Sequence, residues 1–313
     1  MKYRRFAERI AFLLILAGGG LLAMATEGGA QELQPRRWSH LPVNMNFGGA
    51  GYAYTNADIG FDPVMLIEDA EMDLHAAAFQ YIRTFELFGK SARLDMTQAY
   101  ADVRWSGLLD GAQTSTSRSG WTDTTLRLAV NLLGAPPLEG KEFAAYRAGV
   151  APCETVVGVG LAVQLPTGHY REERLLNIGT NRLTFRPQLG VVHSRGKWSA
   201  ELTTSIWMFT ENEDFWDGNM LENDPLYTVQ GHVVYTFRPG LWIGGGLAYG
   251  SGLESTVNGS YKNDRKENLL FGFSLGVPIT RQVGFKIGYL GMRTQASVGS
   301  DSDTVVAAVS FMW

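Results

Sequence analysis

The sequence predicts an antiparallel transmembrane β-barrel of about 12 strands, with both chain termini in the periplasm. Three observations lead to this fold class. The N-terminus has the composition of a secretory signal peptide, and the rest of the chain repeats short segments in which apolar and polar residues alternate. No later apolar run reaches the ~18 to 20 residues that a spanning helix needs. Any membrane crossing after the N-terminal region must therefore be made by strands.

The N-terminal region indicates export. An apolar run over 10–24 is followed by the small residues Gly28 and Ala30, as at a signal-peptidase site, and is preceded by Lys2, Arg4, Arg5 and Arg9. An N-terminal membrane anchor is the alternative, which the short run disfavours. We divide the chain into a signal peptide over 1–30, an N-terminal periplasmic segment over 31–43 and a barrel over 44–313. We expect the mature protein in the outer membrane of a Gram-negative cell.

The composition agrees with a sheet that faces lipid on one side. Charged residues make up 19% of the chain and aromatic residues 12%, and 37 of the 313 residues are Gly. A net charge of -4 offers no basic surface for phosphates, so we exclude nucleic acid as a partner. The one cysteine, Cys153, cannot form an intrachain disulfide. We expect no metal or other cofactor.

Segments of alternating polarity recur along the mature chain. In one of them, Leu183, Phe185 and Leu189 share a face that suits lipid. Arg182 and Arg186 lie on the opposite face, which tolerates water. The predicted strands cover approximately 46–56, 72–86, 92–105, 121–133, 154–165, 182–193, 198–209, 226–238, 240–251, 267–278, 281–293 and 303–313.

The connections between these strands alternate in length. Short links near 194–197, 239 and 280 are predicted hairpin turns, and the long polar links cover about 57–71, 106–120, 166–181, 210–225, 252–266 and 294–302. Short periplasmic turns opposite long external loops are typical of outer-membrane barrels. Residues 134–153 break this rule, because they form a long link on the side of the turns. Either a helix over 139–148 or an irregular proline-rich loop fits them.

The C-terminal strand carries a predicted assembly signal. Val309, Phe311 and Trp313 occupy alternate positions, and the aromatic Trp313 is the last residue. A strand of this form is what the barrel-assembly machinery of the outer membrane is generally understood to read. We therefore expect this machinery and the outer-membrane lipid as partners.

Several strings extend over nearly the whole mature chain. They are PRRWSHLPVNMNFGGAGYAYTNADIGFDP (35–63), AEMDLHAAAFQYIRTF (70–85), NLLGAP (131–136), LPTGHY (165–170), NIGTNRLTFRPQLG (177–190) and NDPLY (223–227). In combination they resemble the bacterial family of phenol-degradation meta-pathway outer-membrane transporters. The resemblance implies an outer-membrane barrel and a transport role, and it carries over no functional residues.

A catalytic site has to be considered, because outer-membrane barrels include phospholipases and proteases. If the predicted strands 198–209 and 226–238 pair, His232 lies opposite Thr203 or Ser205, with Glu201 about one pair further. A hydroxyl, an imidazole and a carboxylate suit nucleophilic catalysis. A polar lumen collects the same residue types to satisfy one another, however, and no nucleophile motif surrounds them. We expect no catalytic residues.

The predicted inward faces carry polar and charged side chains. These side chains either form a plug through mutual hydrogen bonds or line a thin water path. The candidate lumen-lining residues are Arg127, Arg182, Arg186, Gln188, Glu201, Gln230, His232 and Lys286, and Arg238 is predicted to accompany them. The acidic segment 210–225 is either a cation site or a solvated loop. Gly158 and Gly160 are expected to ease either close strand packing or a bend.

These observations predict a passive channel for small-molecule solutes, including aromatic or hydrophobic ones. The first alternative is a closed barrel that acts as a structural or interaction protein through its outer loops. The second alternative is an outer-membrane hydrolase.

Overall fold

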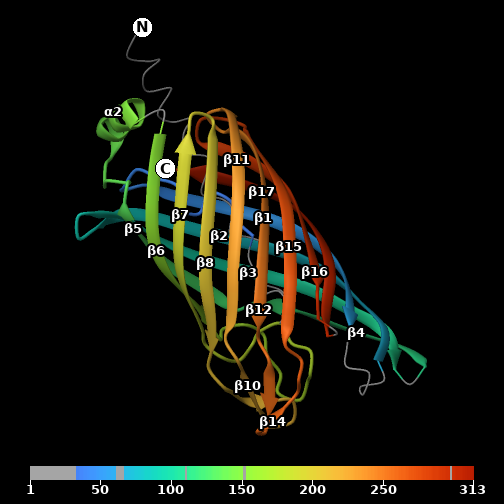
Figure 1. The fold of residues 1–313 in the computed structure, drawn as a ribbon. Helices are drawn as coiled ribbons and strands as arrows, with labels where there is room; N and C mark the ends of the chain where they lie inside the picture. The colour runs from blue at the N-terminus through green and yellow to red at the C-terminus, as the bar shows by residue number, and fades with distance from the viewer. Residues whose placement is uncertain (1–32, 61–66, 110, 151–152, 297) are drawn as a thin grey trace.

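The computed structural model describes residues 33–60, 67–109, 111–150, 153–296 and 298–313 of the chain. The predicted signal peptide over 1–30 lies outside these residues. The described part folds into an antiparallel sheet that closes on itself, because β2 (Ile67–Leu87) pairs with both β1 (Asn46–Gly60) and β3 (Lys90–Leu109). Figure 1 shows the resulting oblique barrel.

Neighbouring strands of the barrel are mostly neighbours in sequence. The remaining wall strands are β4 (Ala112–Trp121), β5 (Thr124–Leu133), β6 (Cys153–Leu165), β7 (Thr184–Arg195), β8 (Trp198–Phe209), β11 (Leu226–Arg238), β12 (Leu241–Gly252), β15 (Lys266–Pro278), β16 (Val283–Thr294) and β17 (Gly299–Met312). Because β4 and β5 both pair with β3, one after the other, the thirteen described strands occupy twelve positions around the wall. The predicted barrel of about 12 strands is confirmed.

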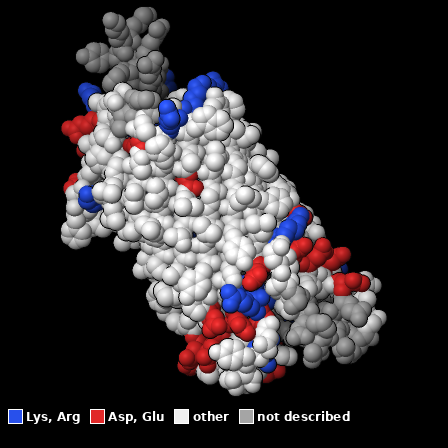
Figure 2. Space-filling view, viewed as in Figure 1, with Lys and Arg blue, Asp and Glu red and all other residues white. Residues whose placement is uncertain are grey.

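Side chains alternate between the outside and the inside of the wall, as the period of a strand requires. On β11, Val229 and Val233 are 44% and 51% exposed, whereas Gln230 and His232 are buried. On the face shown in Figure 2, charged side chains gather at the two ends of the molecule and are scarce between them. A middle zone with few charged side chains suits the hydrocarbon core of a bilayer. No helix in the described ranges is long and apolar enough to cross a membrane.

The two ends of the barrel differ, and we call them the turn end and the loop end. The turn end carries the short links β7–β8, β11–β12 and β15–β16, and the loop end carries the long links such as 166–183. β1 begins and β17 ends at the turn end, where the backbone N–H of Asn46 donates to the carbonyl of Trp313 over 3.0 Å. The location of the turn end in the periplasm stays a prediction.

The prediction of long loops is wrong for two segments, 57–71 and 106–120. β1 and β2 extend well into 57–71, and residues 106–120 form most of the β3–β4 hairpin. The serine and threonine residues of 112–119 favour a loop by composition, but they pair residue by residue with β3, as Thr114 does with Gly107. Within 57–71 the inner face remains apolar, because Ala57 and Ala70 are buried.

Short strands also form within the predicted loops 210–225 and 252–266. They are β9 (Asn212–Phe215), β10 (Asn219–Asn223), β13 (Ser255–Val257) and β14 (Ser260–Tyr261), which make a separate four-stranded sheet. This sheet lies at the loop end of the barrel (Figure 1). The long external connections are therefore partly ordered by pairing with each other.

The irregular link at the turn end contains helix α2 (Gly140–Val150), so the helical alternative for this link is confirmed. The helix is anchored by Phe143, which is buried and meets the ring of His40 edge-on at 4.9 Å between centroids. α2 therefore lies against residues that precede the first strand.

Candidate functional site in the barrel interior

The structure places most of the candidate lumen residues inside the wall. Lys286 is partly buried and Arg238 is exposed at the end of β11; the others are buried, namely Arg127, Arg182, Arg186, Gln188, Glu201, Gln230 and His232. Their sequence neighbours Leu128, Leu189 and Leu202 are 40% to 57% exposed on the outside. That the candidate lumen residues line a transport path remains a prediction.

Residues 33–43, which we call the N-terminal segment, contact three sides of the interior. Leu33 packs against an apolar cluster on β12, β15 and β16. Trp38 packs against residues of β5, β6 and β7, and Leu41 packs against the start of β1 and the end of β17. The segment therefore crosses the barrel from wall to wall. The periplasmic location predicted for 31–43 remains a prediction.

Trp38 is the main anchor of the N-terminal segment. Its indole N–H donates a hydrogen bond of 2.9 Å to the Oγ1 of Thr203. The ring lies where three glycines leave room, since a Cβ added at Gly158 or Gly190 would overlap it and one at Gly160 would touch it. At Gly158 and Gly160 the absence of a side chain makes room for this indole, which the sequence does not predict.

A charged network lies beside Trp38. The guanidinium of Arg127 lies over the indole at 4.8 Å, donates to Gln188 over 2.7 Å and pairs with Asp95 at 3.1 Å. The same Asp95 oxygen pairs with Arg93 at 2.7 Å. Sequence reasoning missed Arg93 and Asp95, although both fall on the inward positions of an alternating segment, between exposed Leu94 and Met96.

Glu201 contacts the N-terminal segment. One of its carboxylate oxygens accepts the backbone N–H of Arg37 over 3.3 Å. The Arg37 guanidinium donates to Gln34 within the segment over 2.8 Å. The buried carboxylate of Glu201, which belongs to the barrel wall, therefore binds the N-terminal segment.

The predicted register of the catalytic alternative is wrong by one inward-facing pair. His232 lies opposite Glu201, Thr203 lies opposite Gln230 and Ser205 lies opposite Thr228. The Ser205 and Thr228 hydroxyls hydrogen-bond each other at 2.6 Å, and the Thr203 hydroxyl accepts from Trp38. In this register neither hydroxyl lies directly opposite His232, as the catalytic alternative requires.

The turn end holds the N-terminal segment through α2 and its flanks. His40 lies 3.3 Å from Glu154 and 2.8 Å from the carbonyl of Pro136, one partner for each ring nitrogen. Glu154 also pairs with Arg147 of α2. These contacts tie the segment to the link between β5 and β6.

Three arginines stack on aromatic rings along one wall. Arg182 lies over Phe209 at 4.6 Å, Arg186 over Trp207 at 4.2 Å and Arg127 over Trp38 at 4.8 Å. Arg127 and Arg186 flank a single small residue, because both pair with Ala162. This wall, formed by β5 to β8 and the end of the 166–183 link, carries guanidinium groups that stack on flat aromatic rings.

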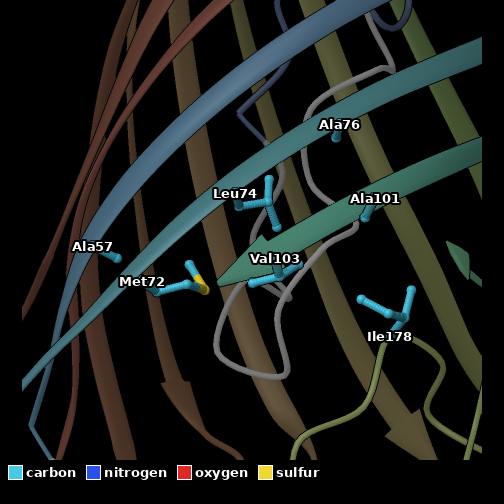
Figure 3. Close-up of a cluster of buried hydrophobic side chains, with 7 residues drawn as sticks. All are labelled: Ala57, Met72, Leu74, Ala76, Ala101, Val103 and Ile178. Atoms are coloured by element: carbon cyan, nitrogen blue, oxygen red, sulfur yellow. The ribbon is translucent and has the colours of Figure 1, made fainter. Parts of the chain in front are cut away.

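The wall toward β1, β2 and β3 is apolar near the loop end. Its buried cluster consists of Ala57, Met72, Leu74, Ala76, Ala101 and Val103, with Ile178 from the 166–183 link (Figure 3). Asp123 holds that link in place by accepting hydrogen bonds from Gly168 and Thr180. The interior therefore has one wall rich in arginine and one wall of aliphatic side chains.

The acidic segment 210–225 is largely built into the small sheet at the loop end. Within the ranges that the structure describes, no group of three or more His, Cys, Asp or Glu side chains is arranged to hold a metal ion. Asp214 illustrates the local bonding, because its backbone N–H donates to the side chain of Asn212 at 3.2 Å.

A closed antiparallel wall, an apolar outer band and a polar interior define an outer-membrane β-barrel. The chain belongs to the family described as "Putative MetA-pathway of phenol degradation", whose model matches residues 47–300. Comparison with curated proteins gives no matching sequence.

A solved structure with a TM-score well above 0.5 has the same barrel fold. A crystal structure of an outer membrane channel from Pseudomonas putida F1 superposes with a TM-score of 0.75 at 19% identity, covering 90% of this chain and 100% of that one. The transport unit of the autotransporter AIDA-I from Escherichia coli gives 0.49 at 8% identity, covering 92% and 94%. The Pseudomonas putida toluene transporter TodX gives 0.44 at 8% identity, covering 96% and 99%.

Proposed function

We propose that this barrel is a passive channel for small molecules, including aromatic or hydrophobic ones, and that the N-terminal segment narrows it. The observation that carries the proposal is the division of the interior into an arginine wall and an aliphatic wall. An interior lined by polar groups alone would offer no apolar contact to such solutes. An aliphatic inner wall near the loop end instead suits solutes with apolar surface.

The comparisons support a transport role. The structure from Pseudomonas putida F1 is described as an outer membrane channel, and the match covers 90% of this chain. The family description refers to phenol degradation, which agrees with an aromatic solute. We also propose that residues 1–30 are a signal peptide, that the chain is inserted by the barrel-assembly machinery and that it performs no catalysis.

One observation favours a closed barrel instead. The N-terminal segment touches three sides of the wall, and Trp38 is held by a hydrogen bond and by its place over Gly158 and Gly190. If the segment never leaves this position and blocks the interior, the protein is a structural or interaction barrel.

Uptake into vesicles separates the two functions. We expect purified protein in lipid vesicles to admit phenyl glucoside, a neutral aromatic solute that crosses lipid slowly, faster than protein-free vesicles do. Each preparation is checked for the faster gel migration of the unheated chain, because a closed barrel has no free strand edge and resists detergent. Folded protein that admits no more phenyl glucoside than lipid alone would contradict the channel.

A further inference from the structure

His40 joins the N-terminal segment to helix α2 at the turn end. Its side chain is fully buried. The rings of Phe143 and Tyr146, both from α2, meet the imidazole edge-on at 4.9 Å and 5.2 Å between centroids. Its neighbours in the segment, Trp38 and Leu41, pack against the barrel wall. His40 therefore connects α2 to the part of the segment that crosses the interior.

Both hydrogen-bond partners of His40 are acceptors. Its Nε2 lies 2.8 Å from the carbonyl oxygen of Pro136, and its Nδ1 lies 3.3 Å from a carboxylate oxygen of Glu154. Arg147 pairs with the other oxygen of this carboxylate, which favours the ionised form and leaves it no proton to donate. A neutral imidazole has one N–H and an imidazolium has two. Both bonds therefore form together only when His40 is protonated.

Charged groups of both signs surround His40. Glu154 on β6 and Glu201 on β8 favour the imidazolium, whereas Arg147 on α2 and Arg36 of the N-terminal segment oppose it, and all four line one cavity of about 50 Å³ beside the ring. Burial raises the pKa of Tyr146, so this phenol stays neutral. The cavity is larger than a water molecule needs. Water can therefore exchange a proton with the buried ring.

Loss of the proton removes one of the two bonds of His40. Whichever nitrogen loses its hydrogen then directs a lone pair at an oxygen acceptor, and such a contact is costly in a buried site. Imidazole is the side chain that changes charge between about pH 5 and about pH 8. The contact between the N-terminal segment and the link that contains α2 is therefore stronger in acid.

Resting on the proposed channel function, we propose that His40 is a pH-sensitive anchor of the N-terminal segment. The protonated ring binds Pro136 and Glu154 together and holds the segment in the position that narrows the barrel. The neutral ring binds only one of them, and the segment leaves this position more often. The channel is therefore more restricted at acid pH than at alkaline pH.

The test records single-channel conductance of the full chain in planar bilayers at about pH 5 and about pH 8. We expect wild-type protein to be open about tenfold more of the time at the higher pH, as loss of a hydrogen bond to a charged group predicts. Heat-dependent gel migration at each pH shows that the barrel itself stays folded.

Two variants assign the pH response to this contact. His40→Gln keeps an N–H donor at every pH, so its open time should be the same at both pH values. Glu154→Gln replaces an acceptor by an amide that donates as well as accepts, so a neutral ring keeps both bonds and the response should again be lost. The matched control is His193→Gln, because His193 is exposed near the same end of the barrel, and we expect it to keep the wild-type response.

The outcomes separate this inference from the channel function, with each variant checked for the gel shift of a folded barrel. If neither wild-type protein nor Trp38→Ala conducts at either pH, the channel is contradicted together with the inference. If wild-type protein conducts equally at both pH values, the channel stands and the inference is overturned. A pH response that persists in His40→Gln belongs to another group and overturns it as well.

Discussion

Trp38 shows how one side chain positions the N-terminal segment in the barrel. Its indole fills the space over Gly190 and Gly158, hydrogen-bonds Thr203 and lies beneath the guanidinium of Arg127. A tryptophan buries a large apolar area, and its N–H needs a partner when buried. Both requirements are met at this one place on the wall.

Changing Gly190→Ala should release Trp38. The added Cβ would overlap the indole, and overpacking of this kind costs roughly 1–3 kcal/mol. We expect a lower free energy of unfolding in urea and faster phenyl glucoside uptake, because the segment is displaced. The matched control is Gly231→Ala, where the nearest atom to the added Cβ is 3.8 Å away. Equal uptake and stability in both variants would show that Trp38 does not hold the segment.

At the residue scale, alternation predicts which side of the wall a residue occupies but not its contacts. The buried positions of Arg127, Arg186 and Gln188 follow from the period of the strands. The placement of Trp38 does not, because it lies outside any strand and its partner Thr203 is 165 residues away. The register of His232 was missed by one inward pair, because a polar inner face does not specify register as strongly as an apolar one.

Among the elements, β17 closes the barrel against β1. Phe311 and Trp313 face outward, 46% and 54% exposed, and their rings stack at 5.3 Å between centroids. Trp313 exchanges backbone hydrogen bonds of 3.0 Å with Asn46. The end of β17 is therefore accessible from the lipid side while its backbone is paired.

Trp313→Asp, or deletion of Phe311 to Trp313, should leave the chain exported but not inserted. The change removes the terminal aromatic and places a charge on the outer face. Fractionation of outer membranes and the heat-dependent gel shift measure the result. Trp198→Asp makes the same change at an equally exposed aromatic, 57%, in β8. We expect that control to insert better; equal insertion of the two variants would mean that the C-terminus carries no special signal.

The strands were predictable from alternation, whereas the length of some was not. Residues 106–120 are rich in Ser and Thr, which suit both a loop and an edge hairpin, and only pairing with β3 decides between them. For a similar reason, the sequence of 134–153 does not decide between a helix and an irregular loop. Its stabilising contact, Phe143 with His40, joins segments far apart in sequence.

For the whole molecule, closure of the sheet is shown by the pairing of β2 with both β1 and β3. The sequence is consistent with this closure because most strands have one apolar face that suits lipid. The state of the interior depends on the N-terminal segment, which has no periodic pattern. A channel and a closed barrel therefore share the same sequence signature, and their difference lies in a few contacts around Trp38.

Single-channel conductance in planar bilayers tests the channel most directly. We expect wild-type protein to give discrete conductance steps, and Trp38→Ala to give larger or longer openings because the N-terminal segment loses its main anchor. Both proteins must show the gel shift of a folded barrel. Discrete steps that grow in Trp38→Ala are the predicted result, and folded wild-type and variant proteins that both remain without conductance would contradict the account.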